Sequence, residues 1–219
     1  MLEWWLPKNV STYGGQIDSM FHLIYWITSI TFIGVAVTLI AFVFTYRHRE
    51  GRRATYTHGN STLEIIWTVI PALILVMLGI MSRGVWAEIK QTLPAADVTV
   101  RVTGRQFAWK FLYPGPDGKF ETADDVEIPD EMHVPVNKTV RMEMYAEDVI
   151  HSFFVPNLRY KQDVVPGRMI PGWFKATEDG EYEIPCAELC GFGHSGMKGR
   201  LFVHTDEGYD AWIKERWPS

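Results

Sequence analysis

The sequence predicts an all-β domain, a barrel or a sandwich, preceded by an N-terminal two-helix transmembrane hairpin. Two long apolar runs lie within the first ninety residues, and each is long enough to cross a bilayer. From residue 97 the pattern changes to short alternating stretches separated by turn sequences, which is typical of a β-sandwich or a β-barrel. The net charge of −5 argues against a nucleic-acid-binding protein.

The first apolar run covers about residues 20–46. Its sequence "LIYWITSITFIGVAVTLIAFVFTY" contains no charged residue, and a spanning helix needs roughly 20 apolar residues. No small-residue cleavage pattern follows the run, so we interpret it as a retained helix and not as a signal peptide.

The second apolar run covers about residues 63–85 and contains Pro71, which a membrane helix tolerates. The loop between the runs is basic, with four arginines and one acid, so the positive-inside rule makes it cytoplasmic and places both termini outside. We therefore predict three parts. They are an exterior segment over residues 1–19, a hairpin over residues 20–90 and an exterior domain over residues 97–219.

Within the exterior domain, "DVTVRVTGRQFAWKFLYP", "KTVRMEMYAED" and "GRLFVHTD" alternate apolar and polar residues. Turn sequences such as "PGPDG" and "TEDGE" separate them. Residues 116–131 are acidic and polar, which predicts an exposed loop. The sequence "EGYDAWIKERW" near the end predicts a short helix.

The stretch "CAELCGFGHSGM", residues 186–197, contains both cysteines of the chain, a histidine and a methionine. A disulfide between the cysteines is one interpretation, because disulfides persist outside the cytoplasm. However, a bridge that closes so short a loop stabilises weakly. It would also leave His194 and Met197 unexplained.

A metal site uses all four side chains. Thiolate, imidazole and thioether together suit copper, whereas a methionine ligand argues against zinc. A mononuclear blue-copper site needs two histidines and one cysteine, so this stretch has one cysteine too many and one histidine too few. Two thiolates can bridge a pair of ions. The missing imidazole is best supplied by His151, thirty-five residues upstream, ahead of His133 and His204.

The chain resembles subunit II of the haem–copper cytochrome c oxidases over nearly its whole length. The residues that carry the resemblance are "HGNSTLEIIWTVIPALIL", "GRQFAWKF", "EDVIHSFFVP", "VVPGR" and "CAELCGFGHSGM". The resemblance implies a cupredoxin-like barrel with a binuclear copper centre, CuA. The ligands it implies are His151, Cys186, Glu188 through its backbone carbonyl, Cys190, His194 and Met197.

The resemblance also implies a function in electron transfer. Electrons from cytochrome c enter at CuA and pass to haem in subunit I, where oxygen is reduced and protons are pumped, so this chain has no catalytic residue of its own. The implied partners are subunit I, subunit III, the lipid bilayer and a cytochrome c that is soluble, tethered or part of a supercomplex. The implied location is a bacterial or organellar energy-transducing membrane, with the copper domain on its exterior side, periplasmic or intermembrane. The Glu188 carboxylate would bind magnesium or manganese at the interface with subunit I.

The point where electrons enter departs from the family pattern. The family usually has tryptophan at the position of Phe107, and Trp109 matches a second aromatic of the same stretch. We predict that the donor is a tethered or permanently associated cytochrome c, or that electrons enter beside Trp109.

Three acidic residues can be interpreted either as structural or solvated acids or as functional groups. Glu64 suits the first turn of the second membrane helix, behind the capping residues "NST". The family resemblance also places it at the mouth of a proton-uptake path into subunit I. Glu147 and Asp148 are either solvated surface acids or a docking site that steers a cationic cytochrome c.

Other functions fit the sequence less well. A membrane-anchored copper-delivery protein would need exposed, exchangeable ligands. A quinol oxidase subunit lacks the copper site. Nitrous oxide reductase uses the same type of centre but is soluble and has a second large domain, whereas this chain has a hairpin.

Overall fold

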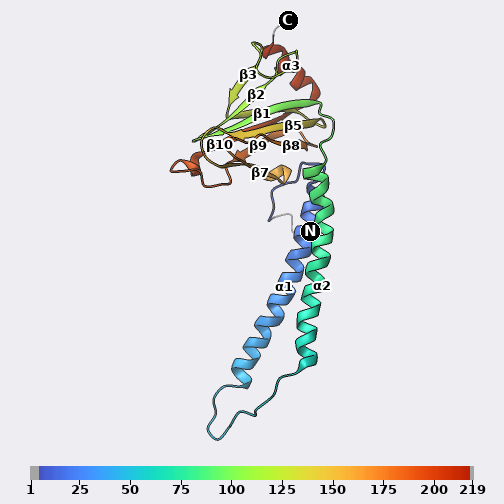
Figure 1. Ribbon diagram of the computed structural model, residues 1–219, viewed down its shortest axis with the longest axis vertical. Helices are drawn as coiled ribbons and strands as arrows, with labels where there is room; N and C mark the ends of the chain where they lie inside the picture. Colours follow the sequence, from blue (N-terminus) through green and yellow to red (C-terminus); the bar gives the residue numbers. More distant parts are fainter. Residues whose placement is uncertain (1–4, 218–219) are drawn as a thin grey trace. The chain divides into compact units, whose positions relative to one another are not determined.

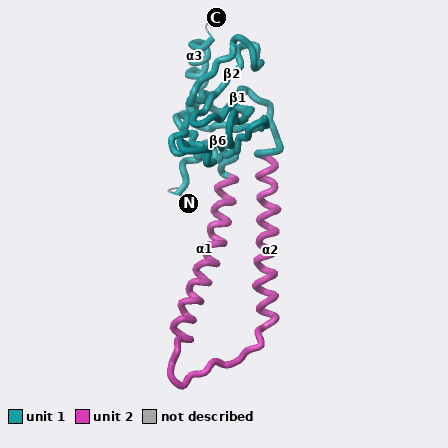
Figure 2. Tube along the Cα trace, turned by 60° about the vertical axis from the view of Figure 1, so that its left-hand side comes forward, with its two compact units in different colours: residues 1–15, 89–219 teal, residues 16–88 magenta. Residues whose placement is uncertain are grey.

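The computed structural model of the chain describes residues 5–217, which form two compact units. One unit contains Gln16–Glu88 and the other contains Met1–Gly15 with Ile89–Ser219 (Figures 1 and 2). Residues 1–4 of the predicted exterior segment and residues 218–219 lie outside the described residues.

The helical unit consists of α1 (Gly14–Thr45) and α2 (Ser61–Trp86), joined by residues 46–60. Both helices are long and apolar enough to span a membrane. Large apolar side chains such as Phe32, Leu75 and Ile80 are strongly exposed along them, as expected for surfaces that face lipid. The hydroxyls of Thr31 and Thr38 donate to carbonyls of the preceding turn, so they need no water inside a bilayer.

The ends of the helices are set by local hydrogen bonds. The Asn60 side chain accepts from the backbone amides of Thr62 and Leu63 and caps α2, which agrees with the predicted capping sequence. Helix α1 begins at Gly14, ahead of the expected start near Met20, because the Ser11 hydroxyl accepts from the Gly14 amide and starts the helix there. At its other end α2 continues into a π-helical turn, η1 (Ala87–Gln91).

The second unit is a β domain in which most strand pairs are antiparallel, while β1 pairs with β5 and β4 with β10 in parallel. Three sheets have the orders β3-β2-β1-β5-β8, β4-β10-β9 and β6-β7. The strands are β1 (Val98–Arg105), β2 (Ala108–Tyr113), β3 (Val126–Pro129), β4 (Glu131–Pro135), β5 (Thr139–Ala146), β6 (His151–Val155), β7 (Tyr160–Val164), β8 (Ile170–Lys175), β9 (Gly180–Pro185) and β10 (Lys198–His204). Two 3-10 turns, η2 (Pro156–Leu158) and η3 (His194–Gly196), and helix α3 (Asp206–Arg216) complete the unit.

The strands form because one face of each is apolar. In β5, Val140, Met142 and Met144 are fully buried, while the residues between them are partly exposed, which is the period of two that a half-buried strand requires. The core also contains large aromatic rings. Phe153 on β6 packs edge to face against Trp109 of β2, with the ring centroids 5.6 Å apart. The predicted β domain behind a two-helix hairpin is therefore confirmed.

The expectation of an exposed loop over residues 116–131 is wrong for its second half. Residues from Val126 onward form β3, which pairs with β2, and β4 starts at Glu131. Ile128 and Met132 are buried, whereas Glu127 of β3 and Glu131 of β4 are exposed on these two edge strands. The Asp130 carboxylate also accepts from the Trp109 amide, which connects the acidic segment to the core.

The short helix predicted near the end is confirmed as α3. Its Trp212 stacks on His133 of β4, and His133 stacks in turn on Phe202 of β10. The Nδ1 atom of His133 lies 2.9 Å from Nε2 of His204, so the two histidines share one hydrogen bond beneath α3.

Because of this histidine pair, we predict that acid lowers the stability of the β domain. Burial lowers the pKa of His133 and the charge of His204 lowers it further, while Glu131 acts in the opposite direction. Burial also lowers the pKa of His204. Both folded-state values lie below the ordinary value of about 6.5, so the unfolded chain binds more protons below that pH. Stability is therefore complete above about pH 6.5 and is lost as the pH falls through the folded-state values.

We expect the melting temperature of the β domain to be lower at pH 5.5 than at pH 7.5. Near-UV circular dichroism of the detergent-solubilised chain measures it. The variant with His133→Phe and His204→Asn should lose part of this difference. A pH dependence that is the same in the variant would contradict the assignment.

Candidate metal centre

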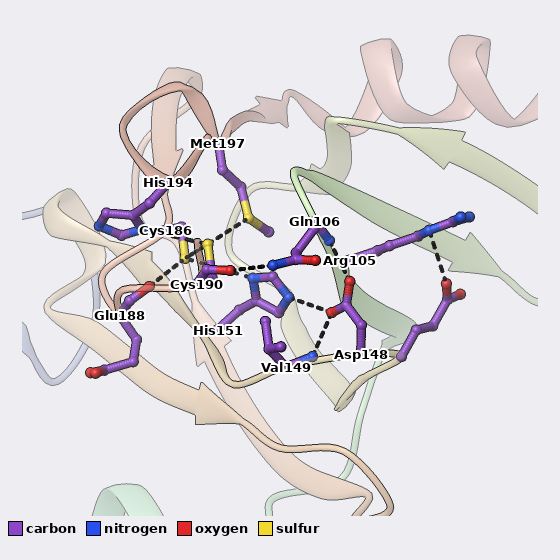
Figure 3. Close-up of polar contacts among 11 residues, drawn as sticks. Arg105, Gln106, Asp148, Val149, His151, Cys186, Glu188, Cys190, His194 and Met197 are labelled. Carbon is purple, nitrogen blue, oxygen red and sulfur yellow. Dashed lines mark hydrogen bonds and ion pairs between the residues drawn. The ribbon is translucent and has the colours of Figure 1, made fainter. Parts of the chain in front are cut away.

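Two segments of the β domain meet around the cysteines. His151 is the first residue of β6, and residues 186–197 form the loop between β9 and β10 (Figure 3). An isolated bridge between Phe153 and Cys186 joins β6 to this loop, and the Ala187 amide donates to the Ser152 carbonyl. Backbone pairing thus holds the two segments together without any ligand.

The two thiols and two imidazoles form one cluster. The sulfur of Cys186 lies 3.9 Å from that of Cys190, and both cysteines are free. Nδ1 of His151 lies 4.0 Å from the Cys186 sulfur, and Nδ1 of His194 lies 3.6 Å from the Cys190 sulfur. The structure therefore brings the predicted imidazoles to opposite sides of a thiol pair.

Two further donors complete the cluster. The thioether sulfur of Met197 lies 3.8 Å from the Cys190 sulfur. The backbone carbonyl oxygen of Glu188 lies 3.3 Å from the Cys186 sulfur, while its carboxylate points away from the sulfurs (Figure 3). All six predicted ligand groups are thus found together.

The cluster is shielded from water. Cys186, Cys190, Met197 and His151 are all buried, and His194 is half-buried. Burial and the neighbouring Cys186 raise the pKa of the Cys190 thiol to about 11. The Cys190 thiol is therefore neutral unless a cation compensates its thiolate, and binding such a cation releases a proton.

The donor set fits a soft metal. Thiolate, imidazole and thioether together are ligands for copper, and hard ions would prefer oxygen. Six donor groups, two of them the thiol sulfurs, exceed the four that a single tetrahedral ion accepts. The residues present therefore fit a metal group with more than one ion.

The aromatic residues expected where electrons enter lie at different depths. Phe107 is 39% exposed in the turn between β1 and β2. A Cβ atom on Gly193 would lie 2.5 Å from its ring, so Phe107 covers the backbone of the loop closely. Trp109 is fully buried and packs edge to face on His151, with the ring centroids 6.1 Å apart. A donor therefore cannot touch Trp109 directly.

The acidic pair before His151 is engaged within the chain. The Glu147 carboxylate lies 3.1 Å from Nζ of Lys110 and 3.7 Å from Nε of Arg105. The Asp148 carboxylate accepts from the ring of His151 and from two backbone amides, those of Gln106 and Val149. Burial raises the pKa of Asp148, but these hydrogen bonds together lower it below its ordinary value. The sequence analysis missed this use of Asp148, although the spacing of three residues to His151 was visible.

The remaining predicted residues lie elsewhere. Glu64 is exposed in the first turn of α2, in the helical unit. His133 and His204, the less favoured imidazole candidates, pair with each other and not with a cysteine. The sequence analysis did not single out Gln106, whose side-chain amide donates to the Cys190 carbonyl at 2.6 Å.

The fold and the site together define a class of protein: a membrane-anchored, cupredoxin-like domain with a buried cluster of donor groups that suits a soft metal. Comparison with known proteins supports this class and narrows it to one family. Residues 98–201 match the family model "Cytochrome C oxidase subunit II, periplasmic domain", and residues 3–85 match the corresponding transmembrane domain. The chain belongs to the cytochrome c oxidase subunit II family.

Individual relatives agree with this assignment. The alternative cytochrome c oxidase subunit 2 of Bradyrhizobium diazoefficiens is 31% identical, over 97% of this chain and 84% of its own length. Cytochrome c oxidase subunit 2 of Cereibacter sphaeroides is 36% identical, over 88% and 75%. The crystal structure of the periplasmic domain of subunit II of cytochrome oxidase from Bradyrhizobium japonicum aligns with a TM-score of 0.51 and 34% identity. That alignment covers 57% of this chain and 96% of the other. The similarity to a periplasmic domain and the two spanning helices fit a membrane-anchored protein with its β domain on the exterior side.

Proposed function

We propose that this chain is the electron-accepting subunit of a proton-pumping haem–copper cytochrome c oxidase, with two copper ions at its CuA centre. The ligands we assign are His151, Cys186, the Glu188 carbonyl, Cys190, His194 and Met197. The observation that carries the proposal is the gathering of all six donor groups around one buried thiol pair. When bound, the copper pair supplies a site that accepts and releases one electron at a time.

The chain's own residues support electron transfer in two ways: they fix the positions of the donor groups and they exclude water from them. The bridge between Phe153 and Cys186 fixes the loop to β6, so the ligands do not need to be gathered when metal binds. Burial of Cys186 and Cys190 excludes water and exchange partners. Buried ligands argue against copper delivery, which requires a donor set open to a partner protein.

We propose that electrons arrive at the surface formed by Phe107. Its ring is partly exposed and lies against the loop, whereas Trp109 is buried behind it and contacts His151. Trp109 thus supports the His151 ring, and Phe107 is the aromatic that a docked cytochrome c meets. A tethered or permanently associated donor remains our expectation for a chain with phenylalanine at this position.

The exposed Glu188 carboxylate supports a second proposal for the same loop. Its backbone faces the thiols while its side chain points away from them, so one residue is able to serve copper and an external hard cation. We assign this carboxylate to magnesium or manganese at the interface with subunit I, since oxygen ligands suit both ions. Subunit I, which holds the haem and reduces oxygen, and subunit III are the proposed membrane partners.

The helical unit supports the proposed topology. The loop between α1 and α2 is basic, which supports a topology with that loop in the cytoplasm and with both termini and the copper domain outside, in a bacterial or organellar energy-transducing membrane. We keep residues 1–19, 20–90 and 97–219 as the exterior segment, hairpin and copper domain. Glu64 then lies at the cytoplasmic end of α2, where we propose that it admits protons to subunit I.

The direct test of the function is electron transfer to the copper-loaded chain in detergent. Reduced cytochrome c, mixed with the oxidised chain in a stopped-flow instrument, should be oxidised while the visible absorption of the copper centre is lost. Bound copper that takes no electron from cytochrome c would exclude the electron-accepting role.

Electrostatic steering gives a further prediction. Replacing Glu147 by glutamine should lower the association rate with a cationic cytochrome c by about twofold to fivefold at low salt, because one attractive charge is lost. The difference should shrink at an ionic strength of about 0.1 M, where the Debye length is about 10 Å. Stopped-flow rates measured against salt check it, with Glu215→Gln on α3 as the charge-matched control. A rate that does not depend on salt would contradict steering.

A further inference from the structure

We infer that Gln106 is a positioning residue, which fixes the relative positions of His151 and of the loop that contains Cys190. It acts on His151 through Asp148 and on Cys190 directly, and the inference rests on the proposed function of that centre. Gln106 itself is exposed in the turn between β1 and β2 and is not a ligand.

The first connection passes through a carboxylate. The Gln106 backbone amide donates to Oδ2 of Asp148 at 2.8 Å, and Nε2 of His151 lies 2.8 Å from Oδ1 of the same carboxylate. A carboxylate accepts only, so Nε2 carries the hydrogen and Nδ1 keeps its lone pair. That lone pair is on the nitrogen nearest the Cys186 sulfur, which is the arrangement a metal-binding imidazole needs.

The second connection passes through the side chain. Nε2 of Gln106 donates to the Cys190 carbonyl at 2.6 Å. The next residue, Gly191, has φ = +134°, and a Cβ atom there would lie 2.7 Å from the same Nε2. The positive φ favours glycine at this position, and the loop backbone lies directly against the Gln106 amide, whose hydrogen bond sets the position of Cys190.

The two connections come from one residue on a rigid element. Residues 101–105 of β1 pair antiparallel with residues 108–112 of β2, so the turn is anchored independently of both ligand segments. His151 and Cys190 belong to segments far apart in the sequence, and Gln106 fixes both against the same turn. Loss of its side-chain amide should loosen Cys190 and leave the strand pairing intact.

Two substitutions of Gln106 isolate the side chain. Gln106→Glu keeps the shape but presents an acceptor to the Cys190 carbonyl, and Gln106→Leu removes the polar group. Both keep the backbone amide that binds Asp148. We expect copper to leave either variant about tenfold faster or more when a chelator is added, which is the usual effect of removing an outer-shell partner. Arg105→Gln, one residue earlier in the same turn, is the matched control and should release copper at the wild-type rate.

The Asp148 connection is tested by Asp148→Ala. This variant should change the nitrogen hyperfine coupling of one histidine in pulsed EPR and shift the reduction potential. A purely structural role would lower the melting temperature and leave the spectrum of the folded protein unchanged. Unchanged copper release in both Gln106 variants, or an unchanged hyperfine coupling in Asp148→Ala, would overturn the inference.

The wild-type chain separates this inference from the proposed function. If it binds no copper pair, the proposed function fails. The positioning role is then judged from amide hydrogen exchange of the metal-free chain. Exchange in residues 187–193 should be about tenfold faster in Gln106→Leu than in wild type or Arg105→Gln, and equal exchange would overturn the role of Gln106.

Discussion

Replacement of Cys190 by serine is expected to abolish the two-copper centre. A serine hydroxyl is a hard oxygen ligand that suits copper poorly, so only one of the two proposed thiolate bridges, that of Cys186, would be left. Electron acceptance from cytochrome c should fall by more than about 100-fold, because even outer-shell partners of metal ligands are worth about 10- to 100-fold. Copper analysis, EPR and stopped-flow kinetics of the detergent-solubilised variant measure the loss.

The control for this substitution is Ser195→Ala. Ser195 is exposed in η3, within the same loop, and is not among the six donors. It should keep the wild-type copper content and rate. Full copper loading of Cys190→Ser with a wild-type spectrum would remove Cys190 from the ligand set.

Replacement of Trp109 by alanine is expected to cost the β domain about 3–5 kcal/mol of unfolding free energy, the usual range for truncating a buried tryptophan. The Trp109 ring is fully buried between His151 and Phe153, so the truncation leaves a cavity directly behind a proposed copper ligand. Trp109→Phe should cost less, since an aromatic ring still fills most of the space. Denaturant unfolding followed by near-UV circular dichroism measures both.

The matched control for Trp109→Ala is Phe192→Ala. Phe192 is fully exposed in the loop of residues 186–197, so its removal should change stability by no more than about 0.5 kcal/mol. If Trp109→Ala proved as mild as Phe192→Ala, Trp109 would not support the site as we describe.

Much of the fold was predictable because the burial of one face leaves a simple pattern in the sequence. The alternation of β5 and the apolar runs of α1 and α2 are examples. Strands β3 and β4 were missed because their outer faces are acidic, so the buried Ile128 and Met132 did not stand out. The start of α1 at Gly14 depends on the Ser11 hydroxyl, which no apolar pattern reveals.

The donor groups of the candidate site were predictable from the sequence, but the residues that hydrogen-bond to them were not. Five of its donor groups lie within twelve residues, so their chemistry is visible in one short stretch. Gln106 acts only because the turn between β1 and β2 meets a loop eighty-four residues later. Asp148 was interpreted as a docking acid, and its hydrogen bond to His151 required the folded chain.

The most direct test of the account is the copper content of the full-length chain together with its low-temperature EPR spectrum. Two thiolates that bridge two copper ions should give two coppers per chain and a seven-line hyperfine pattern, because one unpaired electron is shared equally by both nuclei. One copper per chain with a four-line pattern would contradict the binuclear centre and the function built on it.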